Sequence, residues 1–314
     1  MVHPTRPRRV VTRLVDGDIC AYDLDTDRHG VLSPVVVCRP AAGDEVVSPA
    51  VATDLRTAYY TTLDAVVCVT PDGTAVWRWE FQPQSDQRYG HHPCCVLSAD
   101  GLVVWVYRPD VMAGRDRPDQ WAALDAATGA LIAQADLETA GHGGLQLLHP
   151  ESDHVLLNVG EGQDGSVVYR ASTTGNRMDL FRYPWIDRCL IGLSPDGRHF
   201  LTVDHEQLDA AVHTFPEGDV TFVLTVDAFG HDPDSVYTEW SGGYLDRDTV
   251  VVTLLGETED AQEWFRHYRV DARSGQVRGT FDARTDDPCG IQLLGDGTWL
   301  TTDASGHPVR WSDG

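Results

Sequence analysis

The stretch Leu124-Asp125-Ala126-Ala127-Thr128-Gly129 is a polar turn between two β-rich segments, and it decides the fold. Similar turns recur about every 43 to 57 residues along this chain of 314 residues. Clear copies lie at 22–26, 169–175 and 268–275, and weaker copies lie at 71–73 and 216–218. A repeat of this length that contains only strands predicts stacked four-stranded units, as in the blades of a β-propeller.

A second set of turns alternates with the first and supports the same prediction. It includes Ser98-Ala99-Asp100-Gly101 and Ser194-Pro195-Asp196-Gly197, which separate two apolar runs. Asp-Gly is a hairpin signal because Gly and Asp tolerate the positive φ that a tight turn requires. The flanking segments are rich in β-branched and aromatic residues, and no long segment has a helical period. We therefore predict an all-β chain that forms a single domain, 1–314.

The order of these features resembles a known class of repeat. Strand, Ser-Pro-Asp-Gly, strand, polar loop and Leu-Asp-Xaa-Xaa-Thr-Gly hairpin are similar to the WD40-like and quinoprotein-like (PQQ-like) propeller repeats, over nearly the whole chain. The resemblance implies a ring of four-stranded antiparallel blades and implies no particular activity. The Gly-His and Trp-Asp pairs typical of WD40 repeats do not occur regularly, so the polar tetrad of those repeats is not expected.

The number of blades follows less directly from the sequence. Inner strands are expected to start near Ser48, Cys94, Leu145, Leu190, Thr238 and Gly290. About 26 strands are expected in all, two more than six blades need and two fewer than seven need. Seven blades are favoured over six. The C-terminal strands lack a fourth partner, which one of the segments 10–15, 19–24 or 31–37 could supply, and this would join the two ends of the chain.

The charge of the chain excludes several classes of function. It has 24 basic and 48 acidic residues, for a net charge of −24, and every basic residue is an arginine. Mechanisms that use a lysine are therefore excluded. The arginine-rich composition favours a GC-rich, bacterial genome over the alternative, adaptation to high salt. So acidic a surface repels phosphate backbones, and we expect no nucleic-acid partner.

The sequence also predicts the compartment. No apolar run approaches the roughly 20 residues of a membrane helix, and no signal-peptide core follows the basic segment 1–9, which we expect to be flexible. Seven cysteines without tight spacing are typical of reduced thiols. We predict a cytoplasmic protein with no membrane partner.

A site is expected where two kinds of loop share one face: loops that join consecutive blades, and loops that join the second and third strands of a blade. Imidazoles and carboxylates from several blades fall on these loops. The candidates for acid–base catalysis are His91, His142, Asp187, His205 and Glu239. Together with neighbouring side chains they could hold a divalent metal, or they could be solvated loop residues. No set of metal ligands is assigned, and no other cofactor is expected.

The same loops carry candidates for binding. These are Tyr89, His92, Trp185, Arg188, Trp240, Asp286 and Asp287. Trp121 is a further candidate anchor, because exposed aromatic side chains dominate many binding surfaces. The segment 107–120 has two prolines and alternating charges and is predicted to be an exposed loop insertion.

Cysteines are expected at the beginning of three inner strands, at Cys94, Cys189 and Cys289. A small side chain packs well at such positions, so packing accounts for the cysteines there. A nucleophilic thiol would need a cationic neighbour, such as His92 beside Cys94 or Arg188 beside Cys189.

The sequence leaves two functions open. The first is a cytoplasmic scaffold that binds a protein or peptide on an acidic face with exposed aromatic residues. The alternative is an enzyme with its site at the channel mouth, such as a metal-assisted lyase, a hydrolase or a biosynthetic tailoring enzyme, acting on a small molecule in the central channel. A quinone-dependent dehydrogenase is disfavoured, because such enzymes are exported and this chain has no signal segment.

Overall fold

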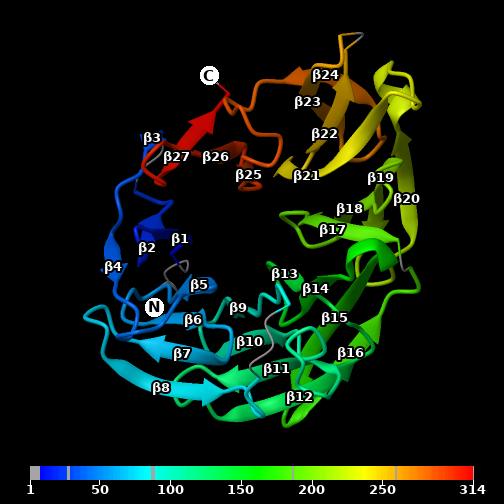
Figure 1. Cartoon of the computed structure of the whole chain (residues 1–314). Coiled ribbons are helices and arrows are strands. Elements are labelled where there is room, and N and C mark those ends of the chain that lie inside the picture. Colours follow the sequence, from blue (N-terminus) through cyan, green and yellow to red (C-terminus); the bar gives the residue numbers. More distant parts are fainter. Residues whose placement is uncertain (1–7, 27–28, 86–88, 186, 259, 314) are drawn as a thin grey trace, which may run out of the picture.

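The computed structural model describes residues 8–26, 29–85, 89–185, 187–258 and 260–313. Figure 1 shows small antiparallel sheets arranged as a ring around a central axis. Seven sheets form the ring, so the prediction of a seven-bladed, all-β propeller is confirmed. The predicted flexibility of the first nine residues concerns mainly residues 1–7, which lie outside the described ranges.

We number the blades along the chain. Blade 1 has three strands, β1 (Val10–Val15), β2 (Asp18–Asp23) and β4 (Val36–Cys38). Blade 2 contains β5 (Ser48–Val51), β6 (Ala58–Thr61), β7 (Ala65–Val69) and β8 (Ala75–Glu80). Blade 3 contains β9 (Cys94–Leu97), β10 (Val103–Arg108), β11 (Asp119–Asp125) and β12 (Leu131–Leu137). Blade 4 contains β13 (Gly143–Leu148), β14 (Val155–Gly160), β15 (Ser166–Thr174) and β16 (Arg177–Arg182).

The remaining blades repeat this pattern. Blade 5 contains β17 (Arg188–Leu193), β18 (His199–Asp204), β19 (Asp209–Thr214) and β20 (Val220–Thr225). Blade 6 contains β21 (Val236–Asp246), β22 (Thr249–Glu257), β23 (Glu263–Asp271) and β24 (Val277–Phe281). Blade 7 contains β25 (Gln292–Leu293), β26 (Thr298–Thr302), β27 (Pro308–Ser312) and β3 (Gly30–Val31). Two short 3-10 turns, Gly162–Asp164 and Val226–Phe229, are the helical elements of the described residues.

The ring closes between its two ends. Strand β3, from the N-terminal part of the chain, pairs with β27 and becomes the outer strand of blade 7, where Val31 lies opposite Val309. The predicted closure by N- and C-terminal strands is therefore confirmed. Of the predicted segment 31–37 only its first residue takes part, in the strand Gly30–Val31, whereas Val36–Cys38 pairs in blade 1. Closing the ring leaves no unpaired blade at either end of the chain.

Turns alternate between the two faces of the ring, which we call the loop face and the turn face. The turn face carries the turns between the first and second and between the third and fourth strands. Asp carboxylates shape these turns: Asp196 accepts a hydrogen bond from the Arg198 N–H at 3.1 Å, and Asp125 accepts one from the Thr128 N–H at 2.8 Å. Gly129 follows with a φ of 70°. This is the physical basis of the Asp-Gly and Leu-Asp-Xaa-Xaa-Thr-Gly signals.

Apolar cores lie between neighbouring blades, and each is built from the central strands of both. Trp105 and Trp121, with ring centroids 5.3 Å apart, belong to one cluster that joins blades 3 and 4. Outer strands are also tied to the next blade: the Trp77 indole N–H donates to the Ala126 carbonyl at 2.9 Å. Only a glycine fits below this ring, because a Cβ on Gly129 would lie 2.6 Å from the Trp77 side chain.

Candidate functional site

The loop face brings together the loops that the sequence placed on one side. The His92 N–H donates to the His142 carbonyl at 2.7 Å, and the His205 N–H donates to the Asp187 carbonyl at 2.6 Å. The first bond joins the loops of blades 3 and 4, and the second joins two loops of blade 5 at the end of the β17–β18 pair. The candidate residues nevertheless fall into separate groups.

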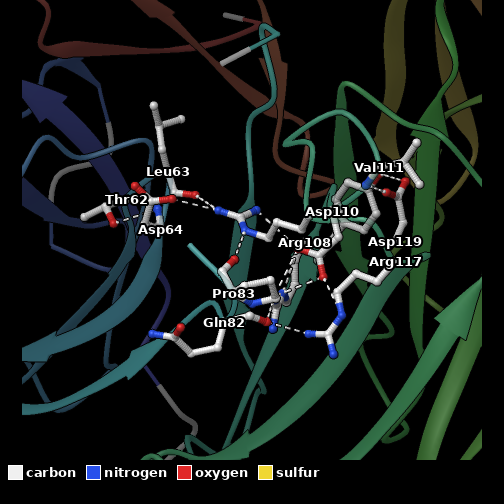
Figure 2. A network of polar contacts seen from close by, with 12 residues as sticks. Thr62, Leu63, Asp64, Gln82, Pro83, Arg108, Asp110, Val111, Arg117 and Asp119 are labelled. Carbon is white, nitrogen blue, oxygen red and sulfur yellow. Dashed lines mark hydrogen bonds and ion pairs between the residues drawn. The ribbon is translucent and has the colours of Figure 1, made fainter. Parts of the chain in front are cut away.

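A buried network of charges lies under the loop face between blades 2 and 3 (Figure 2). Asp110 has no exposed surface, and its Oδ1 accepts hydrogen bonds from Arg108 Nη2 at 3.0 Å and from Arg115 Nη1 at 3.2 Å. Arg115 also donates to Asp64 Oδ1 at 2.8 Å and to the Leu63 carbonyl at 3.0 Å. The network therefore connects the second loop of blade 2 to the long loop of blade 3.

This network corrects the prediction for the segment 107–120. Arg108, Asp110, Ala113, Arg115 and Asp119 are all buried, so the segment is folded into the protein, and only some of its side chains reach the surface. The loop was expected to be exposed because it is polar. Its charges are instead neutralised by one another and by backbone carbonyls, which permits their burial.

Asp119 holds the C-terminal end of this segment in place through hydrogen bonds. Its two carboxylate oxygens accept hydrogen bonds from the Tyr107 and Thr139 hydroxyls and from the backbone N–H groups of Val111 and Gly141, at 2.8 to 3.0 Å. Every donor belongs to the protein and the side chain is buried, so Asp119 has a structural role.

His91, a candidate catalyst, is buried beside this network. It is 3% exposed, and neither ring nitrogen has a hydrogen-bond partner of good geometry among the described residues, although the Leu63 carbonyl lies close. Burial and the nearby Arg115 guanidinium lower the pKa of His91. The structure therefore places this imidazole away from the open channel mouth, in a position that favours its neutral form.

His92 and His142, by contrast, are exposed at the starts of adjacent inner strands. Glu161 lies on the same part of the face and accepts a hydrogen bond from the Ala140 N–H at 2.7 Å. Among the described residues, no three His, Cys, Asp or Glu side chains are grouped as a metal ion would require. The expected convergence of imidazoles and carboxylates on one point is therefore not observed in the described part of the chain.

A second group surrounds Trp240, with His205 beside its ring and Glu239 accepting a hydrogen bond from its backbone N–H at 2.8 Å, while Asp187 contributes its carbonyl to His205. The Trp240 indole N–H donates to the Asp204 carbonyl at 3.2 Å, and its ring lies 5.8 Å from the His205 ring. Trp240 is 45% exposed although its N–H is bound. The side chain is thus held in place while one of its faces remains open to solvent.

A β-bulge explains the position of Trp240. Strand β21 shifts register between Thr238 and Gly242, so that three residues of β21 lie opposite one residue of β22. Gly242 makes the bulge feasible, because its φ is +137° and a Cβ there would lie 2.3 Å from the Val251 carbonyl oxygen. Bulges of this kind re-aim side chains and occur often beside functional sites.

Two candidate binding residues have other roles. Trp185 is half-buried and stacks on Tyr183 at 4.8 Å, and it also packs against His213 at 4.5 Å. The Arg188 guanidinium forms an ion pair with Asp209. Both side chains therefore make contacts with other residues of blades 4 and 5. Trp121 is fully buried, and its N–H donates to Gln146 at 2.9 Å, so the prediction of Trp121 as an exposed anchor is wrong.

The other candidates lie at exposed positions. Tyr89 is exposed on the loop that precedes β9. Asp286 and Asp287 line a hollow of about 360 Å³ together with Arg284. The Asp287 carboxylate is used locally, because it accepts a hydrogen bond from the Cys289 N–H at 2.8 Å.

The inner-strand cysteines do not have the properties of nucleophiles. Burial raises the pKa of Cys94 to about 11 and raises the pKa of Cys189 as well. The pKa of Cys289 is raised by partial burial and then by the neighbouring Glu239 and Asp287 carboxylates. Each thiol is therefore favoured over its thiolate. A packing role agrees with the partial burial of Cys94 and Cys189, whereas Cys289 is exposed and lies before β25.

Two larger hollows lie away from the predicted site. One occupies about 580 Å³ of the central channel and is lined by the inner strands of blades 4 to 7 and by Arg13 of blade 1. The other occupies about 660 Å³ between blades 3 and 4 on the turn face, around His149 and His154. The sequence carries no motif that would identify either, because each is formed by side chains of different blades.

Comparisons with known proteins agree with the fold. No family model matches the sequence, and no curated protein matches it closely enough to count as a relative. The chain is similar to the structure of the Dos1 propeller, with 11% identity and a TM-score of 0.58 over 99% of this chain and 79% of that one.

Two further solved structures are similar. BamB from Moraxella catarrhalis has 12% identity and a TM-score of 0.51 over 99% of this chain and 96% of that one. The dihydro-heme d1 dehydrogenase NirN, in complex with DHE, has 13% identity and a TM-score of 0.55 over 98% of this chain and 64% of that one. The resemblance to quinoprotein-like propellers is thus supported for the fold, and at such identities for the fold alone. In the described part of the chain, no helix has the length and apolar character needed to cross a membrane.

Proposed function

We propose that the protein is a propeller scaffold that binds a segment of a protein partner on its loop face, at a surface centred on Trp240. The single observation that carries this proposal is the exposed indole at the channel mouth, held by a bulge and by its hydrogen bond to Asp204. A rigid aromatic side chain that keeps a large open face costs little entropy when it binds, and such side chains are typical anchors of interfaces.

Two other exposed apolar residues adjoin Trp240. Leu208 is 61% exposed, Tyr237 is 39% exposed, and their segments are joined by the hydrogen bond from the Thr238 N–H to the Gln207 carbonyl at 2.8 Å. We call Leu208, Tyr237 and Trp240 the Trp240 patch. Three neighbouring exposed apolar side chains provide more contact area than an isolated one, and such patches commonly mark interaction sites.

The charge around the patch indicates the chemistry of the partner. The pKa of Tyr237 is raised by partial burial and then by the carboxylates of Glu263, Glu239 and Glu257. The patch therefore has an acidic rim, on a chain with a net charge of −24. A partner segment with one or two apolar anchors flanked by Arg or Lys would complement both features.

The test uses the full chain and two alanine substitutions in the patch. Proteins captured by the immobilised wild type from its native cells are identified, purified and measured by biolayer interferometry. For the physiological partner, Trp240→Ala should weaken the Kd about 30-fold, corresponding to about 2 kcal/mol for an anchor residue. Binding should also weaken as salt is raised, because the rim is acidic.

Leu131 provides a matched control for Leu208. It is an exposed leucine, but it lies on the outer strand β12. Leu208→Ala should weaken binding, and Leu131→Ala should not. If every captured protein bound the Trp240→Ala and Leu208→Ala variants as tightly as the wild type, the assignment of this surface would be wrong.

A further inference from the structure

A further hollow, lined by positively charged side chains, lies between blades 5 and 6 on the turn face. It has a volume of about 310 Å³, and its walls include three arginines, Arg198, Arg247 and Arg273. They come from the first turn of blade 5 and from two turns of blade 6. Three guanidinium groups around one hollow are unusual in a chain with twice as many acidic as basic residues.

The protein neutralises this positive charge only in part. Within the described ranges, no carboxylate lies at ion-pair distance from Arg198 or Arg247. Arg273 pairs with Asp248 at 2.7 Å, but both side chains are largely exposed and the pair is weak. Asp196 also lines the hollow; its carboxylate accepts hydrogen bonds from the Ser194 hydroxyl at 2.8 Å and from the Arg198 N–H, and its negative charge offsets part of the positive charge of the Arg198 guanidinium. The hollow therefore keeps an excess of positive charge.

An unpartnered hydroxyl completes the hollow. Tyr244 lines it, is only 4% exposed, and its hydroxyl has no hydrogen-bond partner among the residues that the structure describes. A buried hydrogen-bond donor without an acceptor destabilises the protein, so an unpaired hydroxyl of this kind needs an explanation such as a bound ligand. A ligand oxygen in the hollow would accept this hydrogen bond.

We propose that this hollow binds the phosphate group of a small phosphorylated molecule. Guanidinium groups bind phosphate oxygens through charge-assisted hydrogen bonds, and the Tyr244 hydroxyl supplies a neutral donor at the inner wall. The volume is at the lower end of the range for small-molecule sites, which suits a phosphate monoester with a short organic part. The site lies on the opposite face from the Trp240 patch and does not depend on the function proposed there.

The test is isothermal titration calorimetry of the full chain with inorganic phosphate and with O-phosphoserine, at pH 8 and constant ionic strength. Both should bind the wild type. Arg198→Gln and Arg247→Gln should each weaken the affinity about tenfold, because each removes a charge-assisted contact. Both side chains are exposed, so these substitutions leave the core intact. Tyr244→Phe should also weaken binding without lowering the stability of the free protein.

The chain offers matched controls for both kinds of substitution. Arg56 is exposed in the equivalent turn of blade 2, where its N–H donates to Asp54 at 3.0 Å, as that of Arg198 does to Asp196. Tyr169 has a buried hydroxyl that also lacks a partner among the described residues, and it does not line this hollow. Arg56→Gln and Tyr169→Phe should bind phosphate like the wild type. The proposal is overturned if neither probe binds, if all variants bind alike, or if acetate at the same ionic strength binds as tightly as phosphate.

Discussion

Replacing Asp110 by asparagine should destabilise the protein more than any substitution of a surface charge. Asp110 has no exposed surface, and the guanidinium groups of Arg108 and Arg115, 3% and 2% exposed, both donate to it. Asparagine keeps the volume of the side chain and one acceptor oxygen but removes the negative charge. The Asp110→Asn variant therefore leaves buried cations without their central counter-ion.

The expected loss of stability follows from the contacts that Arg108 and Arg115 keep in the Asp110→Asn variant. Arg115 keeps its ion pair with Asp64 at 2.8 Å, but Arg108 loses its only carboxylate within the described residues and keeps a carbonyl contact with Gln82 at 3.4 Å. Removing one partner of a buried ion pair costs about 3–5 kcal/mol. The contacts between both guanidinium groups and the Phe81 ring exist in the wild type too and so offset none of that cost, but the ion pair that Arg115 keeps places the loss at the lower end of this range. We expect the free energy of unfolding to fall by about 3 kcal/mol.

The assay is urea unfolding, followed both by tryptophan fluorescence and by far-UV circular dichroism, so that agreement of the two curves tests two-state behaviour. Glu138→Gln is the isosteric control, because Glu138 forms an exposed ion pair with Arg182. It should change the stability by less than about 1 kcal/mol. The double variant Asp110→Asn with Arg108→Gln should lose less than the sum of the two single losses, since the two residues are coupled.

A loss below about 1 kcal/mol for Asp110→Asn would refute this reasoning, because it falls in the range of exposed ion pairs. Additive losses in the double variant would also contradict it, since they would show that Asp110 and Arg108 stabilise the protein independently of each other.

Two further predictions concern pH and the bulge. Burial lowers the pKa of His213 and of His267 to about 4, from an ordinary value of 6.5. The unfolded chain therefore takes up protons first as the pH falls, and stability present at pH 7 should be lost between pH 6.5 and pH 4, by on the order of 2–3 kcal/mol per histidine. Urea unfolding of the wild type and of His267→Gln should show a smaller loss in the variant, and equal losses would exclude His267 as a source. Gly242→Ala should lower the stability by at least about 2 kcal/mol, because its Cβ would collide with the Val251 carbonyl at an unfavourable φ, whereas Gly160→Ala has open space. Unchanged unfolding and unchanged Trp240 fluorescence in Gly242→Ala would show that the bulge does not need this glycine.

The candidate site was only partly accessible from sequence. Alternation of the two turn sets showed which loops share a face, because both sets lie on the turn face and the loops between them lie on the loop face. It did not show how individual side chains point: His91 is buried and His92, its neighbour, is exposed. Among the tryptophans, Trp185 packs inside and Trp240 reaches the surface, because the stacking partners of Trp185 and the bulge at Gly242 depend on contacts between strands.

The local structure could be predicted from the sequence: the strands, the Asp-Gly turns and the propeller repeat. These follow from short-range preferences, since each turn needs particular residues within a few positions. The count of seven blades became clear only in the tertiary structure, because β1, β2 and β4 pair as a separate three-stranded sheet and do not complete another blade. The tertiary structure also decided the buried charge network and the hollow with three arginines. Arg198, Arg247 and Arg273 are far apart along the chain and meet because neighbouring blades pack side by side, a long-range arrangement that no local pattern encodes.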